Sequence, residues 1–106
     1  MTDTSTTFLY AEFQVSAPFE ESIWEDANSA MKTVPGLLNK TWLSGLSTKS
    51  IGGFYEFDSE AHARAYAEGM LADFARNAGG SLTVKLFDGA SVAVASRQMN
   101  SPFYRV

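Results

Sequence analysis

The sequence predicts an α+β domain in which four strands and two helices follow one another in the order βαββαβ. Four segments alternate apolar and mixed side chains with a period of two, which is typical of strands, and two segments repeat apolar residues at steps of three and four, which is typical of helices. Segment 51–57 is followed by Asp58, Ser59, Glu60 and an alanine-rich run, which marks the end of a buried strand and the start of a helix. Two strand–helix–strand units with right-handed crossovers interleave most readily as a four-stranded antiparallel sheet with both helices on one face, the ferredoxin-like arrangement. The expected strand order is fourth, first, third, second.

The first strand is expected over residues 7–15, and a helix follows it. Ser16 is a suitable N-cap, and Pro18 has the backbone angle of a first helical turn. The pair Pro35 and Gly36 ends this helix. Its apolar side chains recur on one face that must lie on the sheet: Phe19, Ile23, Ala27, Ala30, Met31 and Val34.

The second and third strands are expected over residues 37–44 and 51–57, joined as a hairpin by a small polar loop. A second amphipathic helix over residues 59–78 is closed by Gly79 and Gly80, and the fourth strand covers residues 81–87. Residues 1–6 are expected to be a disordered start, residues 7–88 to form one domain, and residues 89–106 to extend it as a helical turn with an extended end. Val92 and Val94 would also suit an added strand.

The composition excludes several classes of function. The chain has 12 acidic and 8 basic residues and no cluster of lysine or arginine, which argues against nucleic-acid binding. It has no apolar run of about 18 residues, so no membrane span is expected. Its first residues are not a basic segment followed by an apolar one, so no signal peptide is expected either. We therefore expect a cytoplasmic protein. It has no cysteine and one histidine, so a cysteine or multi-histidine metal site within one chain is excluded.

The strand residues sort into two faces. One set is apolar enough to be the face that the helices cover. It contains Leu9, Ala11, Phe13, Val15, Leu37, Leu43, Ile51, Tyr55, Phe57, Leu82, Val84 and Leu86. The other set is too aromatic for water and too charged for a simple core, and contains Phe8, Tyr10, Glu12, Gln14, Leu38, Lys40, Trp42, Phe54, Glu56, Thr83, Lys85 and Phe87.

We expect a second copy of the chain to cover the outer set, in a homodimer that meets sheet to sheet. The interface residues would be Tyr10, Glu12, Lys40, Trp42, Phe54, Glu56 and Lys85. Four of them would form a charged row, two acids between two bases, in the order Lys85, Glu12, Glu56, Lys40. The alternative is a solvated outer face with scattered aromatic side chains.

A small-molecule pocket is expected between the sheet and the helices. Asn39, Thr41 and Tyr55 are polar residues on the expected helix side of the second and third strands, and Tyr66 on the second helix could point to the same space. Local hydrogen bonding of each group is an equally good interpretation. His62, the single imidazole, lies in the first turn of the second helix, where it is either a proton-transfer group or a partly exposed helix residue.

Several segments resemble the YdhR-like monooxygenases, small members of the dimeric α/β-barrel superfamily. The matching pieces are Pro18 and Phe19, Pro35 to Leu38 with Lys40 and Trp42, Gly52 to Phe57, Ala63 to Tyr66, and Val84 to Asp88. The resemblance implies a homodimer with facing sheets and a monooxygenase that needs no cofactor and acts on a small aromatic or polyketide-like molecule.

Within that resemblance, His62 and Tyr55 are the candidate catalytic residues, and Asn39, Thr41, Tyr55 and Tyr66 are the candidate substrate-binding residues. An electron-rich phenol supplies the electrons for dioxygen itself, so the protein need only bind it, assist its deprotonation and exclude water. Two other hypotheses stay open: a non-catalytic small-molecule-binding or stress-related dimer of the same fold, and a purely structural partner domain.

Overall fold

The chain folds as one sheet with its two main helices on one side. The structure is a computed structural model, and it describes residues 6–14, 21–78 and 81–104. Its elements, in chain order, are β1 (Thr7–Gln14), α1 (Glu21–Met31), β2 (Leu37–Ser44), β3 (Ser50–Phe57), α2 (Glu60–Tyr66), the π-helical turn η1 (Ala67–Leu71), α3 (Ala72–Ala78), β4 (Leu82–Asp88) and α4 (Ala93–Gln98). The predicted βαββαβ order is confirmed, with α4 added after it.

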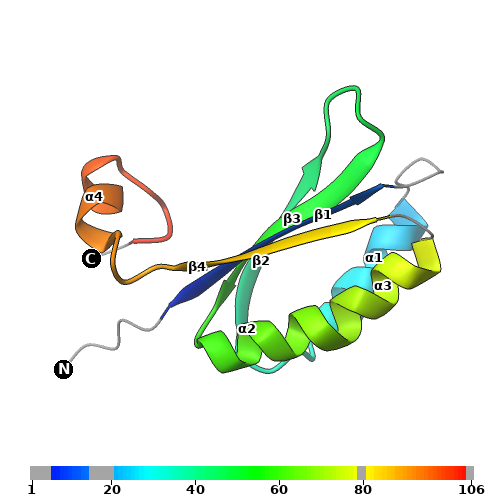
Figure 1. The fold of residues 1–106 in the computed structure, drawn as a ribbon, viewed down its shortest axis with the longest axis horizontal. Helices are drawn as coiled ribbons and strands as arrows, with labels where there is room; N and C mark the ends of the chain where they lie inside the picture. The colour runs from blue at the N-terminus through cyan, green and yellow to red at the C-terminus, as the bar shows by residue number, and fades with distance from the viewer. Residues whose placement is uncertain (1–5, 15–20, 79–80, 105–106) are drawn as a thin grey trace.

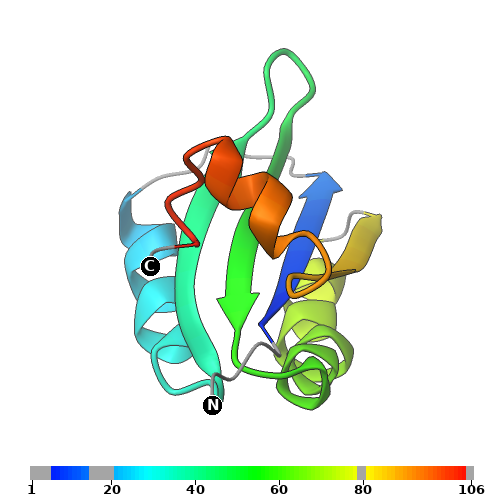
Figure 2. The same ribbon diagram turned by 90° about the vertical axis from the view of Figure 1, so that its left-hand side faces the viewer.

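The four strands form one antiparallel sheet in the order β2-β3-β1-β4, as predicted. Figure 1 shows α1 and the continuous helix α2–η1–α3 on one face of this sheet. Seen from the opposite face, α1 lies behind β2, and α2 to α3 lie behind β1 and β4 (Figure 2). The ferredoxin-like prediction is therefore confirmed for the fold of one chain.

The core lies between the sheet and these helices. Alternate residues of β1 and β3 point into it, and four of the largest side chains there are essentially inaccessible: Leu9, Tyr55, Phe57 and Leu71. Buried residues of the helices complete the cluster: Met31 from α1, and Ala63, Tyr66 and Leu71 from the second helix. We call the sheet face that α1 and the second helix cover the inner face, and the opposite sheet face the outer face.

The second helix is continuous but contains one wide turn. Ser59 caps it by accepting a hydrogen bond from the backbone N–H of His62 at 3.2 Å. The π-helical turn Ala67–Leu71 then widens the helix. Tyr66 and Leu71 are five residues apart, which would turn them to different sides of a regular α-helix, and both are buried in the core. Turns of this kind recur at functional sites, and this one follows a tyrosine of the candidate site directly.

A β-bulge in β2 reverses part of the predicted face assignment. Leu37 pairs with Phe57, but Asn39 already pairs with Glu56, so Leu38 is an extra residue. One extra residue turns every later side chain of the strand to the other face.

The predicted faces are therefore wrong for β2 after the bulge. Lys40 and Trp42, expected on the outer face, lie on the inner face opposite Tyr55 and Gly53. The residues expected on the inner face, Asn39, Thr41 and Leu43, lie on the outer face.

The end of the chain covers part of the outer face. Phe8 stacks on Phe54 with 5.1 Å between ring centroids, and Phe103 packs against Phe54 at 5.3 Å. Tyr104 packs on Phe8 as well and donates its hydroxyl proton to the backbone oxygen of Gly89 at 2.8 Å. Figure 2 shows the segment with α4 in front of the sheet. Phe8 is buried by these contacts within one chain.

The charged row expected across the outer face is incomplete in the single chain, because Lys40 lies on the inner face. Glu12 accepts hydrogen bonds from Ser50 at 2.6 Å and from Tyr10 at 2.8 Å, and these two bonds hold the pKa of its carboxyl group below the usual value. Glu56 accepts a hydrogen bond from the Asn39 side-chain amide at 2.7 Å. Both acids of the row thus have neutral partners.

Some predictions lie outside the described residues. They are the disorder of residues 1–5, the N-cap at Ser16 with Pro18, and the closure of the second helix by Gly79 and Gly80. Over the ranges that are described, none of the helices has the length and apolar character that crossing a membrane requires.

Candidate functional site

A small pocket opens between the turn that follows α1 and the first turns of the second helix. Its volume is about 190 Å³, and its walls are mainly apolar. The lining residues are Thr33, Val34, Pro35, His62, Ala65, Tyr66 and Met70. Three of them, His62, Tyr66 and Met70, follow one another at intervals of four along the second helix, so they share one face of it. This volume is smaller than the roughly 300–1,000 Å³ of typical small-molecule sites, so the pocket suits a molecule of one or two rings.

The histidine at this pocket is held by a carboxylate. Nδ1 of His62 lies 2.7 Å from Oδ1 of Asp58, and both side chains are slightly less than half exposed, at 45% and 46%. With the Nδ1 proton directed to Asp58, the other ring nitrogen carries the lone pair that accepts a proton. The backbone fixes this pair, because Asp58 donates its N–H to the carbonyl of Gly36 at 2.9 Å and Ser59 caps the helix that carries His62.

Gly36 makes room for the histidine–carboxylate pair. Its φ of +80° lies in the left-handed region, and a Cβ there would stand 2.6 Å from Cγ of His62. We predict that Gly36→Ala lowers the free energy of unfolding by about 1–3 kcal/mol, through backbone strain together with the steric clash. Urea denaturation of both proteins measures this. An alanine variant as stable as the parent would contradict the described geometry of this turn.

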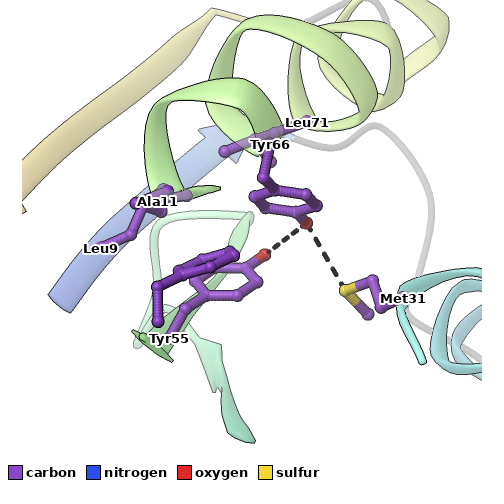
Figure 3. Close-up of a cluster of buried hydrophobic side chains, with 8 residues drawn as sticks. Leu9, Ala11, Met31, Tyr55, Tyr66 and Leu71 are labelled. Atoms are coloured by element: carbon purple, nitrogen blue, oxygen red, sulfur yellow. Dashed lines mark hydrogen bonds between the residues drawn. The ribbon is translucent and has the colours of Figure 1, made fainter. Parts of the chain in front are cut away.

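Two tyrosine hydroxyls meet in the buried core (Figure 3). The Tyr66 hydroxyl lies 3.1 Å from the Tyr55 hydroxyl and 3.5 Å from the Met31 sulfur, so its proton serves one of the two at a time. Burial raises the pKa of Tyr66 to about 12, and burial together with the neighbouring Tyr66 raises the pKa of Tyr55 further. Both groups therefore stay protonated at neutral pH and act as hydrogen-bonding groups.

A lysine lies on the inner face of β2 among aromatic side chains. The Lys40 ammonium is 3.1 Å from the centroid of the Trp42 ring and 4.8 Å from that of Tyr55, and its Nζ lies 3.3 Å from the Met31 sulfur. Its aliphatic part crosses Gly53, where a Cβ would stand 2.6 Å from Cε of Lys40. Glycine at position 53 thus allows the lysine to lie flat against the sheet.

Lys40 has an unusual electrostatic environment. Burial lowers its pKa from 10.5 to about 7. Within the described ranges, the ion pairs are Asp58–His62, Glu60–Arg64 and Asp73–Arg76, so no carboxylate there pairs with Lys40. The groups that face it are a thioether from α1, the Trp42 ring and the Tyr55 ring. Near neutral pH a substantial fraction of this amine is uncharged and able to accept a proton.

The structure brings together some of the predicted site residues and separates others. His62 and Tyr66 line the pocket, and Tyr55 lies behind Tyr66. Asn39 and Thr41 lie on the outer face, away from the pocket, because of the bulge at Leu38. Their placement in the pocket was wrong.

Of the residues expected in the dimer interface, five are on the outer face: Tyr10, Glu12, Phe54, Glu56 and Lys85. The other two, Lys40 and Trp42, are on the inner face, where the Trp42 indole N–H donates to the Asn28 side-chain oxygen at 3.0 Å.

Sequence reasoning missed three residues of the site: Asp58, Lys40 and Met31. The Asp58 signal was available, because Asp58 and His62 are four residues apart across a helix start. A signal for the lysine was also present, since the adjacent apolar pair Leu37 and Leu38 breaks the alternation of the strand. Nothing in the spacing indicated that Met31 would lie between Lys40 and Tyr66.

No group of three or more histidine, cysteine, aspartate or glutamate side chains that could hold a metal ion occurs in the ranges 6–14, 21–78 and 81–104. A comparison with protein-family models matches residues 8–99 to the family described as "Putative mono-oxygenase ydhR". The match includes every residue of the pocket and most of the chain. A comparison with curated proteins gave no match.

Proposed function

We propose that this chain, which belongs to the YdhR family of mono-oxygenases, oxygenates a small phenolic, polyketide-like molecule in the pocket lined by His62 and Tyr66, without a cofactor. The observation that carries the proposal is the pairing of His62 with Asp58 on the wall of a mainly apolar pocket that Tyr66 also lines. A proton acceptor, a hydrogen-bond donor and apolar walls are what the oxygenation of a phenol asks of a protein.

The roles follow from the positions of the two groups. His62 and Tyr66 are one helical turn apart, so both reach one aromatic ring that lies along the helix between them. Tyr66 donates a hydrogen bond to the phenol oxygen. His62 accepts the proton from the opposite, para carbon, and Asp58 stabilises the imidazolium that results.

The reaction balances without an added reductant. The para C–H of the phenol becomes a C=O, the phenol C–OH becomes the second C=O, and the phenol is oxidised to a quinone. One atom of dioxygen enters the product and the other leaves as water with the two hydrogens lost by the substrate. The substrate supplies all four electrons that dioxygen takes up, which is the basis for proposing that no cofactor is needed.

Oxygen uptake tests this proposal. Purified protein with naphthol or anthrone should consume dioxygen and form quinone in equal amounts, at a rate proportional to the protein concentration and unchanged by a metal chelator. No rate above the protein-free background across such a panel would overturn the proposal. A rise in melting temperature with naphthol but without quinone formation would instead favour a binding protein of the same fold.

We further propose that two copies associate through the outer face. Phe87 and Leu43 lie there and are exposed at 46% and 36% in the single chain, and Leu38 in the bulge is exposed at 57%. They lie on β2 and β4, the two edge strands, on either side of the aromatic residues of β1 and β3, and a sheet face with this much apolar surface is more typical of an interface than of a free surface. A second copy would bury them beside the aromatic cluster of Phe8 and Phe54.

Light scattering after size exclusion measures the assembly. The parent protein should elute with twice the mass of one chain, and Leu43→Glu should shift the protein toward the mass of one chain, because a carboxylate in the interface loses its hydration. Leu46→Glu at the tip of the β2–β3 loop, where Leu46 is almost fully exposed, is the matched control and should stay dimeric. A parent protein that elutes as a single chain at micromolar concentration would contradict this assembly.

A further inference from the structure

Two hydrogen-bond donors inside the fold converge on one poor acceptor. The Lys40 ammonium and the Tyr66 hydroxyl both approach the sulfur of Met31, at 3.3 Å and 3.5 Å. A thioether is a weak acceptor, and an ammonium ion removed from water needs strong ones. Figure 3 shows Met31 reaching from α1 toward the two tyrosines, and the contact with Lys40 places the sulfur between the two donors.

The other contacts of Lys40 do not replace a strong acceptor. Trp42 and Tyr55 offer the faces of their rings, and the described ion pairs do not include this lysine. A cation with these neighbours is arranged to attract an anion that fits among aromatic rings. Methionine is flexible and tolerates displacement better than a branched side chain.

We propose that Lys40 and Tyr66 bind the ionised oxygen of a phenol, with the Met31 side chain moving aside as the ligand enters. The inference rests on the proposed function, because it uses the same pocket, and it adds that the substrate is held as its phenolate. Tyr66 lines the pocket and also contacts Met31, so a ring whose oxygen replaces the sulfur would extend outward past Val34, in the direction of the first turn of the second helix. Its para carbon would then lie toward His62 at the mouth.

The chemical consequence is a lower pKa for the bound phenol. An anionic oxygen beside a poorly solvated ammonium and a tyrosine hydroxyl is stabilised relative to the neutral phenol. The phenolate is also the electron-rich form that reduces dioxygen. The low pKa of free Lys40 agrees with this arrangement, since the amine can take the phenol proton as the anion forms.

The binding of para-nitrophenol tests the inference, because its phenolate is yellow and its phenol is colourless. In slightly acidic buffer, saturating protein should raise the ratio of phenolate to phenol in the bound probe about tenfold, equivalent to lowering the probe's pKa by about one unit. Lys40→Met should abolish this yellow shift. Lys49→Met changes an exposed lysine in the β2–β3 turn and should behave as the parent protein.

A methionine variant and the binding measurements decide the outcome. Met31→Leu should keep the shift, because the sulfur is displaced and not used. The inference is overturned if the parent protein binds the probe in equilibrium dialysis without the phenolate band, if it fails to bind the probe, or if Lys40→Met retains the band while circular dichroism shows native structure. The probe is not oxidised, so binding and turnover are measured separately. A phenolate band without naphthol turnover would reject the proposed function and leave this inference standing. Naphthol turnover without the phenolate band would reject this inference and leave the proposed function standing.

Discussion

Replacing Lys40 with methionine should make the protein more stable at acidic pH. The lysine is charged at pH 6 in both the folded and the unfolded protein, and the folded protein removes much of that charge from water without a carboxylate partner among the described residues. Methionine fills a similar volume between the Trp42 and Tyr55 rings without that cost. We expect the free energy of unfolding to rise by about 2 kcal/mol, which allows for the solvent that still reaches the ammonium.

The stability difference should depend on pH in a defined direction. The folded protein loses the Lys40 proton near pH 7, whereas the unfolded chain keeps it until about pH 10.4. Unfolding therefore takes up a proton between these values, and the stability of the parent protein rises with pH relative to the Lys40→Met variant. Urea denaturation at pH 6 and at pH 9 measures the difference, which should shrink at the higher pH. A variant less stable than the parent at pH 6 would contradict the described environment of this amine.

Replacing His62 with glutamine should lower the rate of phenol oxygenation by about 100-fold or more, with the fold intact. General-base catalysis typically contributes about 10²–10⁴-fold, and glutamine keeps a hydrogen bond to Asp58 but accepts no proton at its amide. Because binding along Tyr66 and the apolar wall remains, kcat should fall and KM should change little. Initial rates of oxygen uptake with naphthol measure both constants.

Two further variants separate catalysis from structure. Asp58→Asn should reduce kcat less than the histidine change does, because it leaves the imidazole in place and removes the charge that stabilises its protonated form. Arg64→Gln on the same helix breaks an exposed ion pair with Glu60 and should leave the rate unchanged. A His62→Gln variant with the parent's kcat would show that the proton goes elsewhere.

Local sequence patterns predicted most of the fold correctly. Alternation with a period of two assigned the faces of β1, β3 and β4 correctly, because each pairs without interruption along its length. In β2 the same rule failed after Leu38, because one extra residue turns all later side chains to the opposite face. The extra residue is recognised only when the pairing with the partner strand is known. This single residue moved Lys40 and Trp42 inward and Asn39 and Thr41 outward.

The site was predictable where it depends on one helix and not where it depends on several elements. His62 and Tyr66 are neighbours because they are four residues apart, which the sequence shows directly. The contact of Lys40 with Met31 joins β2 to α1, and the contacts of Phe103 and Tyr104 with Phe8 bring the chain end back to the first strand. Such distant contacts follow from packing in three dimensions, which periodicity does not encode.

Isotopically labelled dioxygen gives the most direct test of an oxygenation in the pocket lined by His62 and Tyr66. Parent protein incubated with naphthol under labelled dioxygen should yield quinone with one labelled oxygen atom and release the second in water, while the His62→Gln variant forms almost none. Quinone whose new oxygen is unlabelled, or hydrogen peroxide formed in proportion to quinone, would contradict the proposal.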